Sequence, residues 1–263
     1  PTESGRAPAS IPLEDIGLLV VESNQATLTQ HLLSKLAEYN IAWLGCGADH
    51  MPNYLGLPLE GNSITGKRTR LQVDASEPLK KNIWQQLVRQ KIINQATILS
   101  RHGHASTSQR LLRLSKQVRS GDVNNCEGVA AAAYWPALFG PDFVRVRGGQ
   151  DFNAPLNYGY AVLRAAVARA IVGAGMLPVL GLHHKNQYNA FALADDLMEP
   201  FRPYVDSWVH NMPPEFYQPV LTPDGKKQVL GLLTLDVVIE KKTSPLWNAI
   251  QTSVNSLVGV FQG

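Results

Sequence analysis

Residues 181–203 read GLHHKNQYNAFALADDLMEPFRP, which places two histidines and a cluster of carboxylates within an otherwise apolar neighbourhood. An ionised carboxylate is costly to remove from water, so acids grouped on one face usually mean a metal ion, a cationic partner or acid–base chemistry. Carboxylates beside imidazoles fit a bound divalent cation best of these three. The stretch therefore predicts a metal site and a helix that carries it.

A helix that begins after Asn189 sorts the rest of this stretch into two arcs, because side chains on one face recur every 3.6 residues. The polar arc holds Asp195, Asp196, Glu199 and Arg202, and the apolar arc holds Leu193, Leu197, Met198 and Phe201. Asp196 and Glu199 are close enough to share one ion, and Arg202 is placed to hold a carboxylate. Pro200 predicts a kink just after Glu199.

An ordinary solvated helix face would show the same acids, so the helix alone leaves this alternative open. His183 and His184 favour the metal site, because they follow an apolar run and directly precede the helix. An imidazole in that place can serve as a nitrogen ligand or as a proton carrier.

Glu127 is a second conspicuous acid. It opens the alanine-rich segment CEGVAAAAYW (residues 126–135), whose small side chains allow close helix packing. A carboxylate here can simply be favoured by the dipole at a helix N-terminus. The other interpretation makes Glu127 a third metal ligand.

Six segments, spread over most of the chain, carry a family resemblance. They read EDIGLLVVE, HMPNYLGLPLEGNS, SEPLKKNIWQQ, CEGVAAAAYW, FNAPLNYGYAVLRAAVARAIVGAG and LGLHHKNQYNAFALADDLMEPFRPYVD. With these segments the chain resembles the CRISPR-associated integrases that insert new spacers into CRISPR arrays, especially their type II representatives.

The resemblance implies a set of site residues. Metal ligands in that family are a glutamate in E-x-x-x-A-x-x-Y, a histidine that closes G-x-x-H and an acid in D-x-x-E-x-F-R-P, which fall here on Glu127, His184 and Glu199. His184, rather than His183, stands fifteen positions before Glu199, as in the family. Asp196 matches the first acid of the last motif and is expected to assist catalysis. The implied cofactor is Mg²⁺ or Mn²⁺.

The implied reaction is a metal-dependent transesterification, in which the 3′-hydroxyl of a short DNA duplex attacks a phosphodiester of the repeat. Two carboxylates and an imidazole can hold a divalent ion with open positions, which stabilises charge on the phosphate and lowers the pKa of the attacking hydroxyl. A proton-shuttle role for His184 remains an alternative to ligation. The resemblance also implies double-stranded DNA as the substrate, a homodimer, and the small second CRISPR-associated subunit as a partner.

Positive charge is concentrated in one block of the chain. Residues 67–120 hold twelve lysines or arginines against two acids, a net charge of +10 in a chain whose formal charge is +3. A basic block coupled to an acidic metal cluster fits an enzyme that acts on nucleic-acid phosphodiesters, because cations hold the backbone while carboxylates hold the ion.

Within and after this block, a small set of cations is predicted to contact DNA. Arg110, Arg113 and Lys116 recur at three-residue steps beside an apolar stripe of Leu111, Leu112 and Leu114, which fits phosphate contacts without sequence readout. A solvated amphipathic helix is the alternative. The further DNA-binding candidates are Lys80, Lys81, Arg145 and Arg147.

The pattern of elements predicts an α+β fold with a small β-rich N-terminal domain at residues 1–75 and a larger all-α catalytic domain at residues 76–263. Strands are expected within residues 15–22 and 41–46, on either side of a helix at 27–39. The later helices are expected at 76–101, 107–118, 122–137, 155–174, 189–209 and 245–260. Relatives usually open with a β-hairpin that is lacking before residue 11, so the front sheet is expected to be truncated or completed otherwise.

The sequence predicts a protein of the prokaryotic cytoplasm without a membrane span. Its longest apolar run, residues 170–182, is interrupted by glycines and a proline and is shorter than the roughly 20 residues that a spanning helix needs. Cys46 and Cys126 form no paired framework, which favours free thiols in a reducing compartment. Two alternatives to the integrase remain: a metal-dependent nuclease that hydrolyses branched DNA, and a DNA-binding scaffold with a degenerate metal site.

Overall fold

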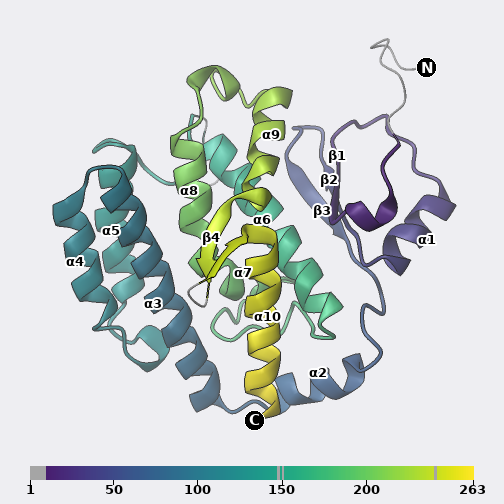
Figure 1. The fold of residues 1–263 in the computed structure, drawn as a ribbon, viewed down its shortest axis with the longest axis horizontal. Coiled ribbons are helices and arrows are strands. Elements are labelled where there is room, and N and C mark those ends of the chain that lie inside the picture. Colours follow the sequence, from purple (N-terminus) through teal and green to yellow (C-terminus); the bar gives the residue numbers. More distant parts are fainter. Residues whose placement is uncertain (1–9, 147–148, 150, 240–241) are drawn as a thin grey trace.

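The computed structural model describes residues 10–146, 149, 151–239 and 242–263. A small sheet with one helix lies at one side of the molecule, and helices make up most of the remainder (Figure 1). The two parts differ in the kind of backbone pairing that their sequences favour. Short β-branched and aliphatic runs form the sheet, whereas long segments with helical periodicity form the remainder.

The sheet consists of three strands in the order β1-β2-β3. These are β1 Leu18–Val21, β2 Ala42–Cys46 and β3 Pro52–Gly56. β1 and β2 pair in parallel, and β2 and β3 pair antiparallel. A parallel pair needs a crossover connection, which here includes helix α1 Gln30–Glu38. The side chain of Thr29 caps this helix by accepting a hydrogen bond from the backbone N–H of Leu32 at 3.1 Å.

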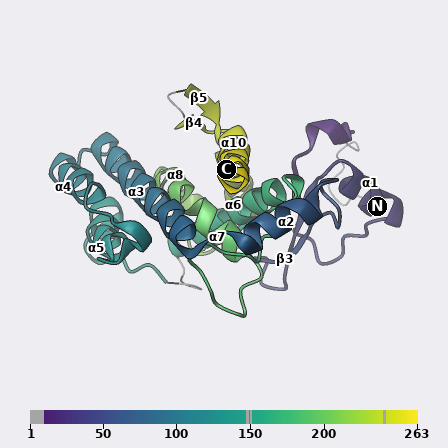
Figure 2. The same ribbon diagram turned by 90° about the horizontal axis from the view of Figure 1, so that it is seen from below.

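The helical part contains nine longer helices among the described residues. They are α2 Thr65–Asp74, α3 Glu77–Arg101, α4 Ala105–Ser115, α5 Cys126–Phe139, α6 Asn153–Gly173, α7 Ala192–Met198, α8 Arg202–His210, α9 Pro223–Leu230 and α10 Leu246–Gln262. A single 3₁₀ turn, Glu199–Phe201, joins α7 directly to α8. A hairpin of β4 Asp236–Ile239 and β5 Lys242–Pro245 leads into α10 and projects beside it (Figure 2).

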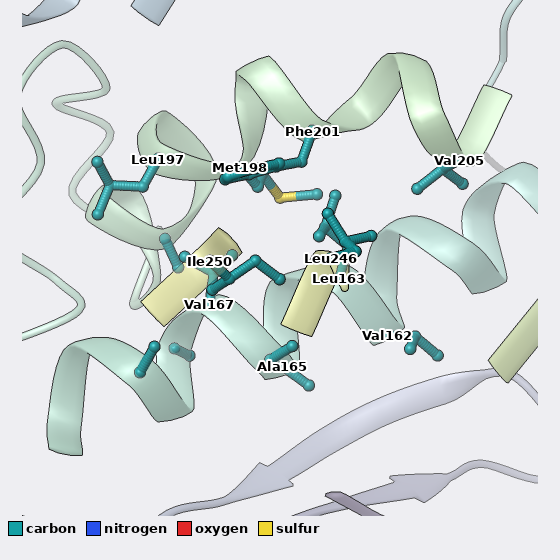
Figure 3. Packing of buried hydrophobic residues seen from close by; sticks show 14 of the residues in the cluster. Val162, Leu163, Ala165, Val167, Leu197, Met198, Phe201, Val205, Leu246 and Ile250 are labelled. Atoms are coloured by element: carbon teal, nitrogen blue, oxygen red, sulfur yellow. The ribbon is translucent and has the colours of Figure 1, made fainter. Parts of the chain in front are cut away.

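The larger core is built around α6. Leu163 and Val167 of α6 meet apolar side chains of the α7–α8 segment and of α10, including Met198 and Ile250 (Figure 3). Leu44 of β2 belongs to the same buried cluster, so the sheet packs on the helical part through this core. Alanines recur along α6 at positions 165, 166, 168 and 170, where small side chains let neighbouring elements approach closely.

A second, separate core is formed by α3, α4 and α5. Trp84 and Ile92 of α3, Leu111 of α4, and Ala130 and Tyr134 of α5 are all buried in it. In the views of Figures 1 and 2, these three helices lie at the end of the molecule opposite the sheet. α3 therefore lies between the two cores, with one face toward α4 and α5 and the other toward the α7–α8 segment.

The fold class predicted from the sequence is confirmed, with a small β-rich front and a mostly helical remainder. Ser76 caps α3, because its hydroxyl accepts a hydrogen bond from the backbone N–H of Leu79. The kink expected at Pro200 is the 3₁₀ turn, since proline lacks the N–H needed to continue the α-helical pattern.

Several elements were not predicted from the sequence. β3 lies outside the expected strands, α2 precedes the expected domain boundary, and α9 and the β4–β5 hairpin lie between the last two expected helices. β3 and the hairpin are short and depend on a neighbouring strand for their hydrogen bonds, which local propensity does not report. The domain boundary at residues 75 and 76 remains a prediction. None of the helices in the described part of the chain is long and apolar enough to cross a bilayer.

We expect Leu163→Ala to lower the free energy of unfolding by about 2–5 kcal/mol, because it removes a fully buried side chain from the centre of the α6 core. Urea unfolding followed by circular dichroism measures this effect. Leu59→Ala is the matched control, since Leu59 is 95% exposed and the same substitution there should change stability by no more than about 0.5 kcal/mol. Equal effects of the two substitutions would contradict the central role of α6.

Candidate active site

Lys91 lies at the meeting point of the two cores and contacts two of the predicted metal ligands. Its Nζ atom donates a hydrogen bond to Oε1 of Glu127 at 2.6 Å and lies 2.5 Å from Oε2 of Glu199. The opposite charges make the second contact an ion pair. Two glutamates that are 72 positions apart in the sequence therefore converge on one cation.

Glu127 is held at the start of α5 by the residues before it. The carboxylate of Asp122 accepts hydrogen bonds from the backbone N–H groups of Cys126 and Glu127 at 2.9 and 3.0 Å, and the side chain of Asn125 caps the helix through Gly128. These contacts satisfy N–H groups that have no partner within the helix. Glu127 is thus a first-turn carboxylate, as one interpretation expected, but it also reaches across to α3.

Glu199 is the more buried of the two glutamates that contact Lys91, with 4% of its surface exposed. It lies in the 3₁₀ turn, and Nε of Arg202 lies 2.8 Å from its Oε1 atom, so Arg202 holds this carboxylate as the sequence predicted. Burial opposes the charge on Glu199, but the adjacent Arg202 and Lys91 outweigh it and hold the pKa of Glu199 below its ordinary value. The same two glutamates overcome the effect of burial on Lys91 and keep the pKa of its ammonium above the ordinary value.

His184 is oriented by Asp196. The Nδ1 atom of His184 lies 2.5 Å from Oδ1 of Asp196, which is completely buried in α7. Asp196 also accepts the backbone N–H groups of residues 182, 183 and 184, at 2.6, 3.0 and 3.3 Å. One carboxylate therefore fixes both the loop backbone and the imidazole ring. The ring of His183 stacks on Trp84 at 4.2 Å between centroids, which ties the same loop to α3.

The contact with Asp196 uses Nδ1 of His184, and among the described residues no hydrogen bond involves its other ring nitrogen, Nε2. A hydrogen bond from a carboxylate to one ring nitrogen is the usual way in which proteins orient a histidine whose other nitrogen binds a metal. The hydrogen bond with Asp196 raises the pKa of His184 above its ordinary value, against the effect of burial. Asp196 thus acts through His184, and the structure does not bring it to the Glu127–Glu199 pair.

A cavity of about 340 Å³ opens beside Lys91 and the two glutamates. Arg202, Arg145, Gln95, Tyr160 and Asp206 contribute to its walls. The hydroxyl of Tyr160 donates to the carboxyl group of Asp206, whose pKa is raised to about 7 by its complete burial. Arg145 is held in place, because its guanidinium donates to the side chains of Asn153 and Asn157 at 3.0 and 2.7 Å.

The solvated-face alternative for the acidic helix is excluded. Asp195, Asp196 and Glu199 are 6%, 0% and 4% exposed, and each has a specific partner. In the described residues, no group of three or more His, Cys, Asp and Glu side chains stands in metal-binding geometry. The two glutamates meet at Lys91, and His184 is close enough for its charge to lower the pKa of Glu199.

The predicted DNA-binding cations fall in two places. Lys81, Arg110, Arg113 and Lys116 are exposed on α3, on α4 and just beyond the end of α4, whereas Lys80 is half-buried and lies 3.9 Å from Glu77. Arg145 faces the cavity instead, and Arg147 lies outside the described residues. The predicted apolar stripe of α4 is buried only in part: Leu111 is buried, whereas Leu112 is 41% exposed.

Sequence reasoning missed Lys91, Gln95, Tyr160 and Asp206 as neighbours of the site. Lys91 was counted only as one of the twelve cations of the basic block, and nothing in its local sequence distinguishes it from the others. The local sequence around Trp84 and Asp206 gives no indication of their place at the site either. Their roles depend on which helices pack together, and a periodic pattern does not contain that information.

Two glutamates on one cation, one buried and one partly exposed, beside a basic helical face, fit an enzyme that processes nucleic-acid phosphodiesters. Residues 2–214 match the family model described as CRISPR associated protein Cas1. The CRISPR-associated endonuclease Cas1 of Neisseria meningitidis serogroup C (strain 8013) is 42% identical over 248 residues, covering 94% of this chain and 81% of that protein. The chain belongs to the Cas1 family. This membership confirms the family predicted from the sequence and the predicted function of a CRISPR endonuclease and integrase.

Two solved structures share the fold. A casposase bound to integration product superposes with a TM-score of 0.76 at 22% identity, covering 94% of this chain and 79% of that one. A Cas6-RT-Cas1–Cas2 complex gives a TM-score of 0.69 at 20% identity, covering 93% of this chain and 30% of that one. At such identities the likeness concerns the fold alone.

We expect Asp196→Asn to lower the pKa of His184 toward its ordinary value of about 6.5, because the substitution removes the charge that stabilises the protonated ring. The folded-state pKa of His184 is raised, so the stabilisation from this pair is complete below the unfolded-state pKa and disappears as pH rises through the folded-state value. The stability difference between wild type and variant should therefore be larger at about pH 5 than at about pH 9.

Two measurements on metal-free protein check this expectation: the NMR titration of the His184 ring and urea unfolding at the two pH values. Asp236→Asn serves as the control, because Asp236 is exposed on β4 and is not among the charges that raise the pKa of His184. A pKa of His184 that is the same in wild type and Asp196→Asn would show that Asp196 does not control the ring.

Proposed function

We propose that the chain is a metal-dependent DNA integrase, in which Glu127, Glu199 and His184 bind Mg²⁺ or Mn²⁺. The observation that carries this proposal is the convergence of two glutamates from different cores on a single cation. Oxygen ligands of this kind suit hard divalent ions, and a stand-in cation already lies between them. Nε2 of His184, which the Asp196 contact does not use, would complete the ligand set.

The proposed reaction is a direct transesterification. The 3′-oxygen of the incoming DNA strand forms a bond to the target phosphorus, while the bond from that phosphorus to the target 3′-oxygen breaks. The attacking hydroxyl loses its proton, and the departing 3′-oxygen gains one. A bound divalent ion supplies charge stabilisation at the phosphate and acidifies the attacking hydroxyl.

The residues of the chain have separate tasks in this proposal. Glu127 and Glu199 provide a fixed negative site, Arg202 holds Glu199 in one orientation, and Asp196 holds the ring of His184. Arg145, which donates to Asn153 and Asn157 at the cavity wall, would contact a DNA phosphate. The exposed cations of α3 and α4 would hold the duplex without reading its sequence.

The proposal extends to partners and setting. The fold is shared with a Cas6-RT-Cas1–Cas2 complex, so we propose that the chain acts on double-stranded DNA as a homodimer with the small second CRISPR-associated subunit. The fold shared with a casposase bound to integration product favours DNA joining over hydrolysis. We place the activity in the cytoplasm of a prokaryotic cell and assign it to a catalytic domain at residues 76–263.

A strand-joining assay tests this function. The protein, its partner subunit, Mg²⁺ or Mn²⁺ and a supercoiled repeat plasmid are mixed with a duplex that ends in a 3′-hydroxyl, and covalent products are quantified. We expect joining to disappear when the duplex ends in a dideoxynucleotide, because the nucleophile is then missing. Unchanged plasmid cleavage with that duplex would instead identify a nuclease that uses water.

In the same assay, we expect large losses of joining, with duplex binding retained, in the variants Glu127→Gln, Glu199→Gln and His184→Asn. Removing a residue that only orients a metal ligand costs roughly 10- to 100-fold, and removing a ligand itself should cost more. Glu60→Gln is the matched control, since Glu60 is exposed and belongs to the sheet side of the chain. Full activity of the three variants would indicate a scaffold whose metal site is not used.

The basic face makes a separate prediction. The double variant Arg110→Gln, Arg113→Gln should weaken duplex binding. Log affinity falls linearly with log salt concentration, and this fall should become shallower by about 0.9 for each phosphate that the protein no longer neutralises. Fluorescence anisotropy at several salt concentrations measures both quantities. Lys35→Gln is the control, because Lys35 is already paired with Glu38 on α1 at 2.6 Å. A slope equal to that of wild type would exclude α4 from the DNA interface.

A further inference from the structure

We propose that Lys91 occupies the cation position between Glu127 and Glu199 when no divalent metal is bound, and that metal binding requires its ammonium group to leave. This inference rests on the metal site proposed above and adds a regulation to it. Lys91 would then be an internal competitor that keeps the two glutamates neutralised and together in the metal-free protein.

The geometry of the two ion pairs disfavours joint occupancy. Both glutamate oxygens lie within 2.6 Å of Nζ of Lys91. An ion such as Mg²⁺ binds carboxylate oxygens at about 2.0–2.1 Å, so an ion bound to either of these oxygens would lie within about 4.7 Å of the ammonium nitrogen. A second positive charge at that place would also be strongly repelled.

Arg202 is not a competitor in the same sense. It contacts Oε1 of Glu199, whereas Lys91 contacts Oε2 of the same carboxylate. A metal ion can therefore replace Lys91 and leave the Arg202 contact intact. The retained contact with Arg202 would keep Glu199 oriented while the metal ion takes the place of the Lys91 ammonium.

The walls of the cavity offer a place for the displaced ammonium. Gln95 lies one helical turn beyond Lys91 on α3 and is buried, and among the described residues its Oε1 atom has no hydrogen-bond partner. A buried acceptor without a partner is uncommon and costs free energy, so an ammonium that moves toward it gains a hydrogen bond. Asp206 lines the same cavity and is near enough for Lys91 to affect its pKa.

The consequence for affinity is a competition. In wild type the metal must break two short ion pairs, whereas in Lys91→Met the aliphatic stem remains and the competing charge is gone. We expect Lys91→Met to bind Mn²⁺ at least about tenfold more tightly than wild type in the absence of DNA. The metal-free variant should also melt at a lower temperature than wild type, because its two carboxylates then repel each other, and Mn²⁺ should reverse this decrease.

The experiment measures free Mn²⁺ by electron paramagnetic resonance during titration of full-length wild type, Lys91→Met, Lys185→Met and Glu127→Gln. Lys185→Met is the matched control: it removes the same charge beside His184, and among the described residues the ion-pair partner of Lys185 is Glu77. Tighter binding by Lys91→Met alone supports displacement. If both lysine variants bind Mn²⁺ equally more tightly than wild type, the loss of any nearby positive charge explains the effect, and the proposal is overturned.

Failure of this inference is distinguishable from failure of the metal site. If Glu127→Gln binds Mn²⁺ as well as wild type, the proposed ligand set is wrong. If Glu127→Gln no longer binds Mn²⁺ but Lys91→Met binds it no more tightly than wild type, only the role of Lys91 is wrong. A crystal structure of wild type with Mn²⁺ gives a check that needs no variant: Nζ of Lys91 should have left Oε2 of Glu199, and a nitrogen still in contact beside a bound ion would overturn the displacement.

Discussion

The contact of Lys91 with Glu127 and Glu199 is the interaction on which the arrangement of the site depends. Two carboxylates that lie close together repel, and a cation between them offsets this repulsion. Glu127 belongs to the α3–α5 core, and Glu199 belongs to the segment that packs on α6. The cation therefore neutralises the site and also joins the two cores, so the chemistry of the site and the packing of the molecule share one constraint.

The short break between α7 and α8 gives the site its second half. In an uninterrupted helix Pro200 would clash with the preceding turn, and the chain instead forms one 3₁₀ turn at Glu199–Phe201. Glu199 and Arg202 lie at the two ends of that turn and pair with each other, while Asp196 one turn earlier faces the histidine loop. A single proline thus divides a buried polar helix into one part that orients His184 and another that presents Glu199.

Helix α3 connects the site with the surface expected to bind DNA. Its first turns expose Lys81, and its middle turns direct Lys91 inward to the glutamates. Trp84, between these positions, is buried and stacks on the loop that carries His184. One helix with 25 residues therefore connects the face proposed to bind phosphate with the proposed metal ligands.

The sequence by itself determined the class of fold, the long helices with their caps, the break at Pro200, and the family with its three expected ligands, because all of these are written in local periodicity or in contiguous motifs. Packing decided the rest. That Lys91 rather than another of twelve cations meets the glutamates, that Asp196 serves His184 instead of sharing an ion with Glu199, and that the acidic helix is buried instead of solvated all follow from which helices touch. Such contacts join positions far apart in the chain, and a charge acquires its role from partners that only the folded chain brings within a few ångströms.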